Sequence, residues 1–105
     1  MMKINGKNIE IKEANSFFEK FRGLMFKKNI NYGLKLRSNG IHTFFMKDKI
    51  DVILTDKNGK VIKIYHGLKP WRIILPKRYV YYTYELPNGF INGFNEEYFE
   101  IKKPL

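Results

Sequence analysis

Runs rich in Ile, Val, Tyr and Phe alternate along the chain with Asn-Gly pairs. Both residues accept positive φ at little cost, so each pair is a candidate hairpin turn or loop corner. Short strands at this spacing indicate an antiparallel sandwich or a small barrel rather than a doubly wound sheet. The pairs are Asn5-Gly6, Asn39-Gly40, Asn58-Gly59, Asn88-Gly89 and Asn92-Gly93.

The clearest hairpin pairs Ile50–Asp56 with Val61–Tyr65. Its Asp-Lys-Asn-Gly connection places Asp where a type I turn favours it and Gly where positive φ is needed. A shorter hairpin is expected for Lys3–Ile4 against Asn8–Lys12, turning at the first Asn-Gly pair. The strand Tyr79–Glu85 carries rings on both faces, which predicts a central position in the sheet, because a face in open water would leave apolar area exposed.

One helix is expected, near Ser16–Arg22. Ser16-Phe17-Phe18-Glu19 has the capping-box pattern, in which the first and last side chains satisfy each other's backbone donors. The aromatic residues that follow recur at helical spacing, and Gly23 can end the helix in a left-handed conformation. The sequence therefore predicts a mainly β domain of the α+β class: a small antiparallel β-barrel-like domain with one short N-terminal helix.

The length of 105 residues predicts a single domain, because it leaves no room for a second core. The absence of cysteine excludes disulfides, thiolate metal sites and a cysteine nucleophile. No apolar run approaches the roughly 18 residues of a membrane-spanning helix. A predicted turn at Asn5-Gly6 comes before any apolar stretch, so no secretory signal is expected and the location is predicted to be cytoplasmic.

The chain is strongly basic, with a formal net charge of +10. From Lys57 to Tyr84 the sequence holds seven basic residues and no acidic one. Such a block can contact phosphates or an acidic protein surface, or it can be a feature of solubility alone. Lys outnumbers Arg, whereas Arg usually leads where planar bidentate recognition matters. The residues assigned to an acidic partner are Lys57, Lys60, Lys63, Lys77 and Arg78.

Three blocks in a fixed order resemble a known family. They are Phe21–Met25, then Ile41–Lys47 running into Ile50–Asp56, then Lys69–Arg72 followed by Tyr84–Gly89. Together they resemble the domain of unknown function 192 family, also called uncharacterised protein family 0127, over about residues 14–95. The resemblance implies a compact β-barrel-like fold with short helices, and it does not point to any particular activity.

Catalytic chemistry has few candidates. His42 and His66 are the only histidines, so no metal site is expected. An enzyme would use His42 with Asp51 holding its tautomer and Arg72 holding the substrate. Neither serine lies in a nucleophile elbow, and hydrogen bonding of His42 to the backbone is the favoured interpretation.

Charged and aromatic residues give the binding candidates. Asp51 and Glu85 lie inside apolar strands, where a carboxyl needs a partner: Arg22, Arg72 or a backbone donor. A fixed Arg–carboxylate network is the preferred interpretation. Trp71 is interpreted either as an exposed ring beside Arg72 that stacks a base, a sugar or a proline, or as a plug at one end of the barrel. The candidate binding residues are Arg22, Met46, Lys47, Trp71, Arg72 and Glu85.

Without a nucleophile, a metal set or a cofactor loop, the sequence favours a non-enzymatic binding or accessory module that uses no cofactor. Two alternatives stay open: an enzyme with a His42/Asp51/Arg72 cleft, and non-specific nucleic-acid binding through residues 57–84. Neither the substrate class nor the identity of a partner follows from the sequence.

Overall fold

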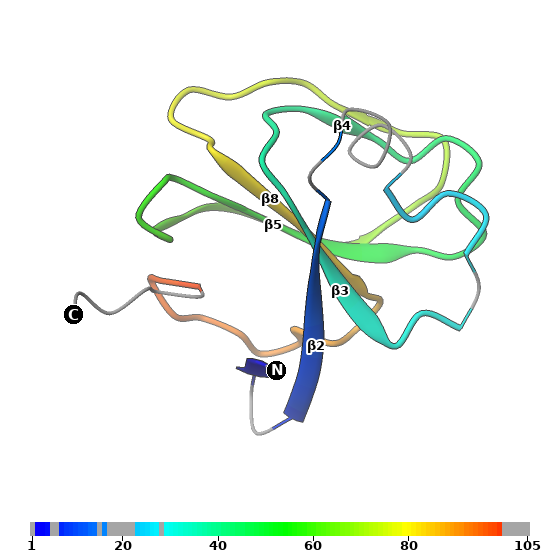
Figure 1. Cartoon of the computed structure of the whole chain (residues 1–105), viewed down its shortest axis with the longest axis horizontal. Helices are drawn as coiled ribbons and strands as arrows, with labels where there is room; N and C mark the ends of the chain where they lie inside the picture. Colours follow the sequence, from blue (N-terminus) through cyan, green and yellow to red (C-terminus); the bar gives the residue numbers. More distant parts are fainter. Residues whose placement is uncertain (1, 5–6, 15, 17–22, 28, 100–105) are drawn as a thin grey trace.

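Figure 1 shows a computed structural model, which describes residues 2–4, 7–14, 16, 23–27 and 29–99. Its strands form one six-stranded sheet and one two-stranded sheet. No helix among the described residues is long and apolar enough to cross a membrane. The strands are β1 (Met2–Ile4), β2 (Lys7–Ala14), β3 (Tyr32–Leu36), β4 (Ile41–His42), β5 (Ile50–Thr55), β6 (Val61–Leu68), β7 (Ile73–Ile74) and β8 (Tyr82–Pro87).

The six-stranded sheet has the order β1-β2-β3-β8-β5-β6. β2 and β3 run parallel, while the other neighbours are antiparallel. The expected antiparallel barrel is therefore wrong: the sheet is mixed, and β1 and β6 are its two edges within the described strands. The long connection between Ala14 and Tyr32 permits this, because parallel neighbours need a crossover of roughly a dozen residues or more.

The expected N-terminal helix is not supported. Residues 17–22, on which most of this prediction falls, lie outside the described residues. The part of the chain that the structure does describe contains no helix. The fold of the described residues is thus mainly β.

Both predicted hairpins are confirmed. β1 pairs antiparallel with β2, and β5 pairs antiparallel with β6. In the β5–β6 turn, Asp56 Oδ1 accepts the amides of Asn58 at 2.8 Å and Lys60 at 3.0 Å, and Gly59 has a φ of 86°. β8 is central as predicted, between β3 and β5, although it begins at Tyr82 rather than at Tyr79.

Hydrophobic clusters lie on both faces of the sheet, and β5 is therefore buried along its whole length. One face of β5 contributes Ile50, Val52 and Leu54 to a cluster with side chains from the loops around β4 and β7. The other contributes Ile53 to a cluster with the segment from Ile91 to Phe99. In Figure 1 the loop layer with β4 lies above the β5–β8 layer, and the orange C-terminal segment lies below it.

Candidate functional site

Thr43 is a buried residue that ties together the loops following β4 and β6. Its amide donates to the carbonyl of Arg72 at 2.8 Å, and its carbonyl accepts the amide of Trp71 at 3.0 Å. Its hydroxyl accepts the amide of Arg72 and donates to the carbonyl of Lys69, both at 2.8 Å. Because both ends of one residue are bonded to the same loop, the two loops hold a fixed relation to each other.

Three rings lie on the loops that Thr43 joins, and a fourth, Phe26, lies in the segment before β3, where its amide donates to the carbonyl of Phe45 at 3.0 Å. We call Phe26, Phe44, Phe45 and Trp71 the aromatic platform. The ring centroids of Phe26 and Phe45 lie 5.4 Å apart, and those of Phe45 and Trp71 lie 4.8 Å apart, edge to face. Phe44 lies 5.7 Å from Trp71. Although they touch, Phe26, Phe45 and Trp71 are 59%, 47% and 56% exposed. The platform is a protruding apolar surface.

The backbone beneath three of these rings is strained. Phe26, Phe45 and Trp71 have φ values of 64°, 62° and 65°. A left-handed conformation costs a bulky L-residue about 1–2 kcal/mol, and Gly would remove that cost. Strain of this kind persists where the surroundings enforce it, and it clusters at binding and catalytic sites. Here it coincides with exposed rings, which gain little from burial.

A cation lies close in sequence to each of the three strained rings. Lys27 follows Phe26, Lys47 comes two residues after Phe45, and Arg72 follows Trp71. Lys47 and Arg72 are exposed. Two exposed cations, Lys47 and Arg72, thus lie within two residues of a platform ring along the chain.

The sequence-predicted binding residues separate into two places. Lys47, Trp71 and Arg72 lie at the platform, and Met46 is buried next to it in the core. The exposure of Trp71 agrees with the exposed interpretation and not with a plug. Glu85 lies elsewhere, and Arg22 is outside the described residues.

Glu85 is a buried carboxyl on β8 whose Oε1 accepts the amide of Leu24 at 3.2 Å. Desolvation by burial raises its pKa to about 8, and the hydrogen bond from Leu24 opposes that rise. The side chain is thus mostly neutral at pH 7. Gly23 lies against it with a φ of +50°, and a Cβ there would come within 2.9 Å of Glu85 Oε1. Only glycine suits this contact.

The three residues of the enzyme hypothesis do not share an open cleft. Asp51 is 0% exposed, and its two oxygens accept the amides of Gly67 at 2.9 Å and Ile91 at 3.3 Å. His42 lies on β4, where its Nδ1 accepts the amide of Phe44 at 3.1 Å, and its strand partner Ile73 adjoins Arg72. His42 and Arg72 are thus neighbours, whereas Asp51 lies in the core.

The basic stretch 57–84 does not form one patch. Lys57 and Lys60 lie at the β5–β6 turn, whereas Lys69 follows the other end of β6, roughly 26 Å away at about 3.3 Å per residue. Lys60 Nζ also lies 3.7 Å from Glu97. The amide of Tyr81 donates to the carbonyl of Thr55, the last residue of β5. The segment after Lys77 therefore lies near the β5–β6 turn.

Sequence reasoning missed Thr43, Phe26 and Phe45 as parts of the site. The Phe44-Phe45 pair beside polar residues was a signal for exposed rings. Thr43 carried no signal, because its role arises only where two loops far apart in sequence meet.

Replacing Thr43 tests how firmly the loops are held. Thr43→Val keeps the shape but removes the hydroxyl that bonds Lys69 and Arg72. We expect the free energy of unfolding to fall by about 2 kcal/mol, because two partly buried hydrogen bonds are lost. Thr43→Ser keeps the hydroxyl and is expected to lose less than half as much in chemical denaturation. Equal stability of Thr43→Val and wild type would show that these bonds contribute nothing.

Comparison with known families gives one consistent result. The model of the DUF192 family, described as "Uncharacterized ACR", matches residues 1–97. A UPF0127 protein of Thermococcus sibiricus is 40% identical over 94 residues, which is 83% of this chain and 60% of that protein. A UPF0127 protein of Pyrococcus horikoshii is 41% identical over 96 residues, covering 85% of this chain and 82% of that protein. The chain thus spans about 60% of the length of the Thermococcus sibiricus protein.

Two solved structures share the fold. A protein of unknown function from Novosphingobium aromaticivorans superposes with a TM-score of 0.74 at 15% identity, over 83% of this chain and 70% of that one. A protein from Sinorhizobium meliloti, described as a putative transcription regulator, gives a TM-score of 0.76 at 16% identity, over 90% and 84% of the two chains. At these identities the likeness concerns the fold alone.

Proposed function

We propose that this chain, which belongs to the DUF192 family, is a non-enzymatic binding module. Its proposed binding surface is the aromatic platform. The observation that carries the proposal is the coincidence of exposure and strain at Phe26, Phe45 and Trp71. A fold gains no stability from holding rings in water on left-handed backbones. A partner that covers them supplies the burial that the isolated chain lacks.

The partner is a protein surface with an apolar centre and acidic groups around it. Trp and Arg lead among residues that dominate protein interfaces, and aromatic residues are enriched at interface cores. Trp71 and Arg72 are adjacent here, and Lys47 adds a second exposed cation. Because the loops are already tied by Thr43, little ordering is needed on binding. The net charge of +10 favours encounter with an acidic surface.

The enzyme alternative has less support. It requires His42, Asp51 and Arg72 around one substrate, and both oxygens of Asp51 are bonded to backbone amides in the core. Among the described residues, no three side chains of His, Asp or Glu gather as ligands for a metal ion. The geometry favours a surface that binds over a cleft that reacts.

Phe45→Gly separates binding from folding. The change removes a platform ring and relieves the left-handed strain at φ 62°. We expect the free energy of unfolding to stay within about 1 kcal/mol of wild type, because relieved strain offsets the lost ring contacts. Affinity for the partner is expected to fall roughly tenfold or more, as at interface hot spots.

The measurement uses Trp71, the only tryptophan of the chain, as a fluorescent reporter inside the platform. Proteins retained from a nuclease-treated lysate are purified singly and titrated against wild type and variants. Tyr79→Gly is the matched control, because Tyr79 is also an exposed ring at positive φ but is not part of the platform. A partner that binds wild type, Phe45→Gly and Tyr79→Gly equally well would refute the platform as the binding surface.

A further inference from the structure

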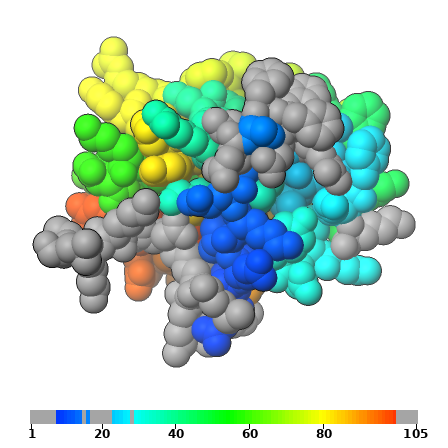
Figure 2. All heavy atoms as spheres, viewed as in Figure 1, coloured from blue at the N-terminus to red at the C-terminus, as the bar shows by residue number. Residues whose placement is uncertain are grey.

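A separate cavity of about 150 Å³ opens between the ends of β2 and β3 and the start of β8. It shares no residue with the aromatic platform. Figure 2 shows β2, in blue, at the front of the molecule. The lining residues are Glu13, Ala14, Lys35, Arg37 and Tyr82.

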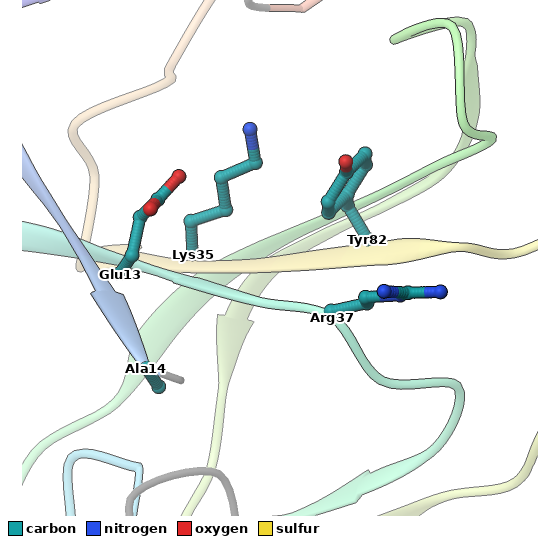
Figure 3. Close-up of a pocket in the computed structure, with 5 residues that line it drawn as sticks. All are labelled: Glu13, Ala14, Lys35, Arg37 and Tyr82. Atoms are coloured by element: carbon teal, nitrogen blue, oxygen red, sulfur yellow. The ribbon is translucent and has the colours of Figure 1, made fainter. Parts of the chain in front are cut away.

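Strand register brings the polar side chains together. Glu13 of β2 is the partner of Lys35 of β3, and Lys35 is in turn the partner of Tyr84 of β8. Arg37 comes two residues after Lys35, which by strand alternation places it on the same side. In Figure 3, Glu13, Lys35 and Tyr82 point to one side of the sheet, and Arg37 extends past Tyr82.

The two cations are held against tyrosine rings. Lys35 is only 6% exposed, and its Nζ lies 4.3 Å from the ring centroid of Tyr82. The guanidinium of Arg37 lies 4.7 Å from the ring centroid of Tyr81, and the Tyr81 and Tyr82 rings meet edge to face at 4.7 Å. A ring attracts a cation without removing its charge, so the exposed Arg37 keeps its attraction for an anion. With the carboxyl of Glu13, the lining carries a formal charge of +1.

The positive surface continues beyond the cavity. Asn39 lies two residues after Arg37, and its amide side chain bonds both the carbonyl and the amide of Lys77, at 2.7 and 2.8 Å. This double contact places Lys77 and the following Arg78 next to the strand end that carries Arg37. Part of the basic stretch 57–84 thus adjoins the strand end that carries Arg37.

We propose that this cavity and the adjoining cations bind the phosphodiester backbone of a single-stranded nucleic acid. A phosphodiester carries one negative charge, which matches the charge of the lining, and a guanidinium can bind two phosphate oxygens at once. The volume equals roughly five water molecules, enough for one phosphate group with part of its sugar. Arg37 stacked on Tyr81 offers a flat surface on which an unpaired base stacks, as aromatic and guanidinium planes do in single-strand complexes.

Glu13 sets the selectivity of the cavity. Its carboxyl repels a doubly charged terminal phosphate more than a singly charged phosphodiester. Glu13→Gln should therefore raise the affinity for inorganic phosphate. The ratio of the affinity for an internal phosphodiester to that for inorganic phosphate should fall.

The test measures fluorescence anisotropy of labelled oligo(U) and oligo(dT) with the full chain at several salt concentrations. If two or three phosphates are contacted, log affinity should fall against log salt with a slope of about −1.4 to −2. Arg37→Ala should reduce the slope by about 0.7 and weaken binding roughly tenfold. Lys35→Met, which keeps the length of the side chain, should act in the same direction.

Lys12→Met is the matched control, because Lys12 Nζ also lies 4.3 Å from a tyrosine centroid, that of Tyr32, outside the cavity. Binding unchanged in Lys12→Met but weakened in Arg37→Ala and Lys35→Met would support the site. Equal losses of affinity in all three variants would show that net charge alone accounts for binding, and would overturn the proposal. Equal affinity for duplex, or no binding of either oligonucleotide by the folded wild type, would also overturn it.

Discussion

Asp51→Ala is expected to lower the free energy of unfolding by roughly 3–5 kcal/mol, because one buried and one partly buried amide lose their acceptor. Asp51 is fully buried on β5, and its oxygens hold Gly67 of β6 and Ile91 of the C-terminal segment. The side chain therefore joins the edge of the sheet to the layer that covers one face. Urea or guanidinium denaturation followed by circular dichroism measures the loss.

Asp56→Ala provides the matched control for this change. Asp56 Oδ1 also accepts two backbone amides, those of Asn58 and Lys60, but at an exposed turn. Water replaces the lost acceptor there, so we expect a loss of about 1 kcal/mol. Similar losses in the two variants would mean that burial of the amides does not govern the effect at Asp51.

The stability of the protein is expected to fall as pH rises through the neutral range, because of Glu85. Its pKa in the fold is about 8, against a model-compound value of 4.5 that represents the unfolded chain. Between these values the folded protein keeps the proton while the unfolded chain has released it. The free energy of unfolding then decreases by about 1.4 kcal/mol for each pH unit. The contribution is fully present below the lower pKa and is lost as pH passes the upper one.

Glu85→Gln isolates this effect, because the amide keeps the shape of the side chain and has no proton to release. The difference in unfolding free energy between wild type and Glu85→Gln should be constant below the lower pKa and decline with pH above it. It should level off above about pH 8, where folded and unfolded carboxyls are both ionised. A difference that does not change with pH would contradict the raised pKa.

Local signals in the sequence determined the strands that pair with their neighbours. The Asp-Lys-Asn-Gly turn and the apolar residues on either side of it predicted the β5–β6 hairpin, because turn chemistry and side-chain alternation act over a few residues. The rings on both faces of Tyr79–Glu85 predicted a central strand for the same reason. Both predictions were correct in kind, although β8 spans Tyr82–Pro87 and is thus shifted toward the C-terminus from the predicted Tyr79–Glu85.

At the platform, the sequence identified Trp71 and Arg72 as candidate binding residues, but it did not predict how their loop lies against its neighbours. Exposure of Trp71 depends on where its loop lies, and that is decided by hydrogen bonds to Thr43, far away in the chain. The carboxyl of Asp51 was predicted to pair with an arginine or a backbone donor, with an Arg–carboxylate network preferred, and its donors are the backbone amides of Gly67 and Ile91. Backbone amides have no signature in a sequence, so no residue pattern could have identified them.

The tertiary structure alone decided the architecture of the sheet. Parallel pairing of β2 with β3 joins strands separated by a long connection, and nothing in either strand specifies direction. That pairing leaves β1 and β6 as separate edges instead of closing a barrel. It also brings Glu13 beside Lys35 and so creates the charged cavity. Turns and alternation are local and can be read from residues, whereas strand order depends on which distant surfaces bury each other best.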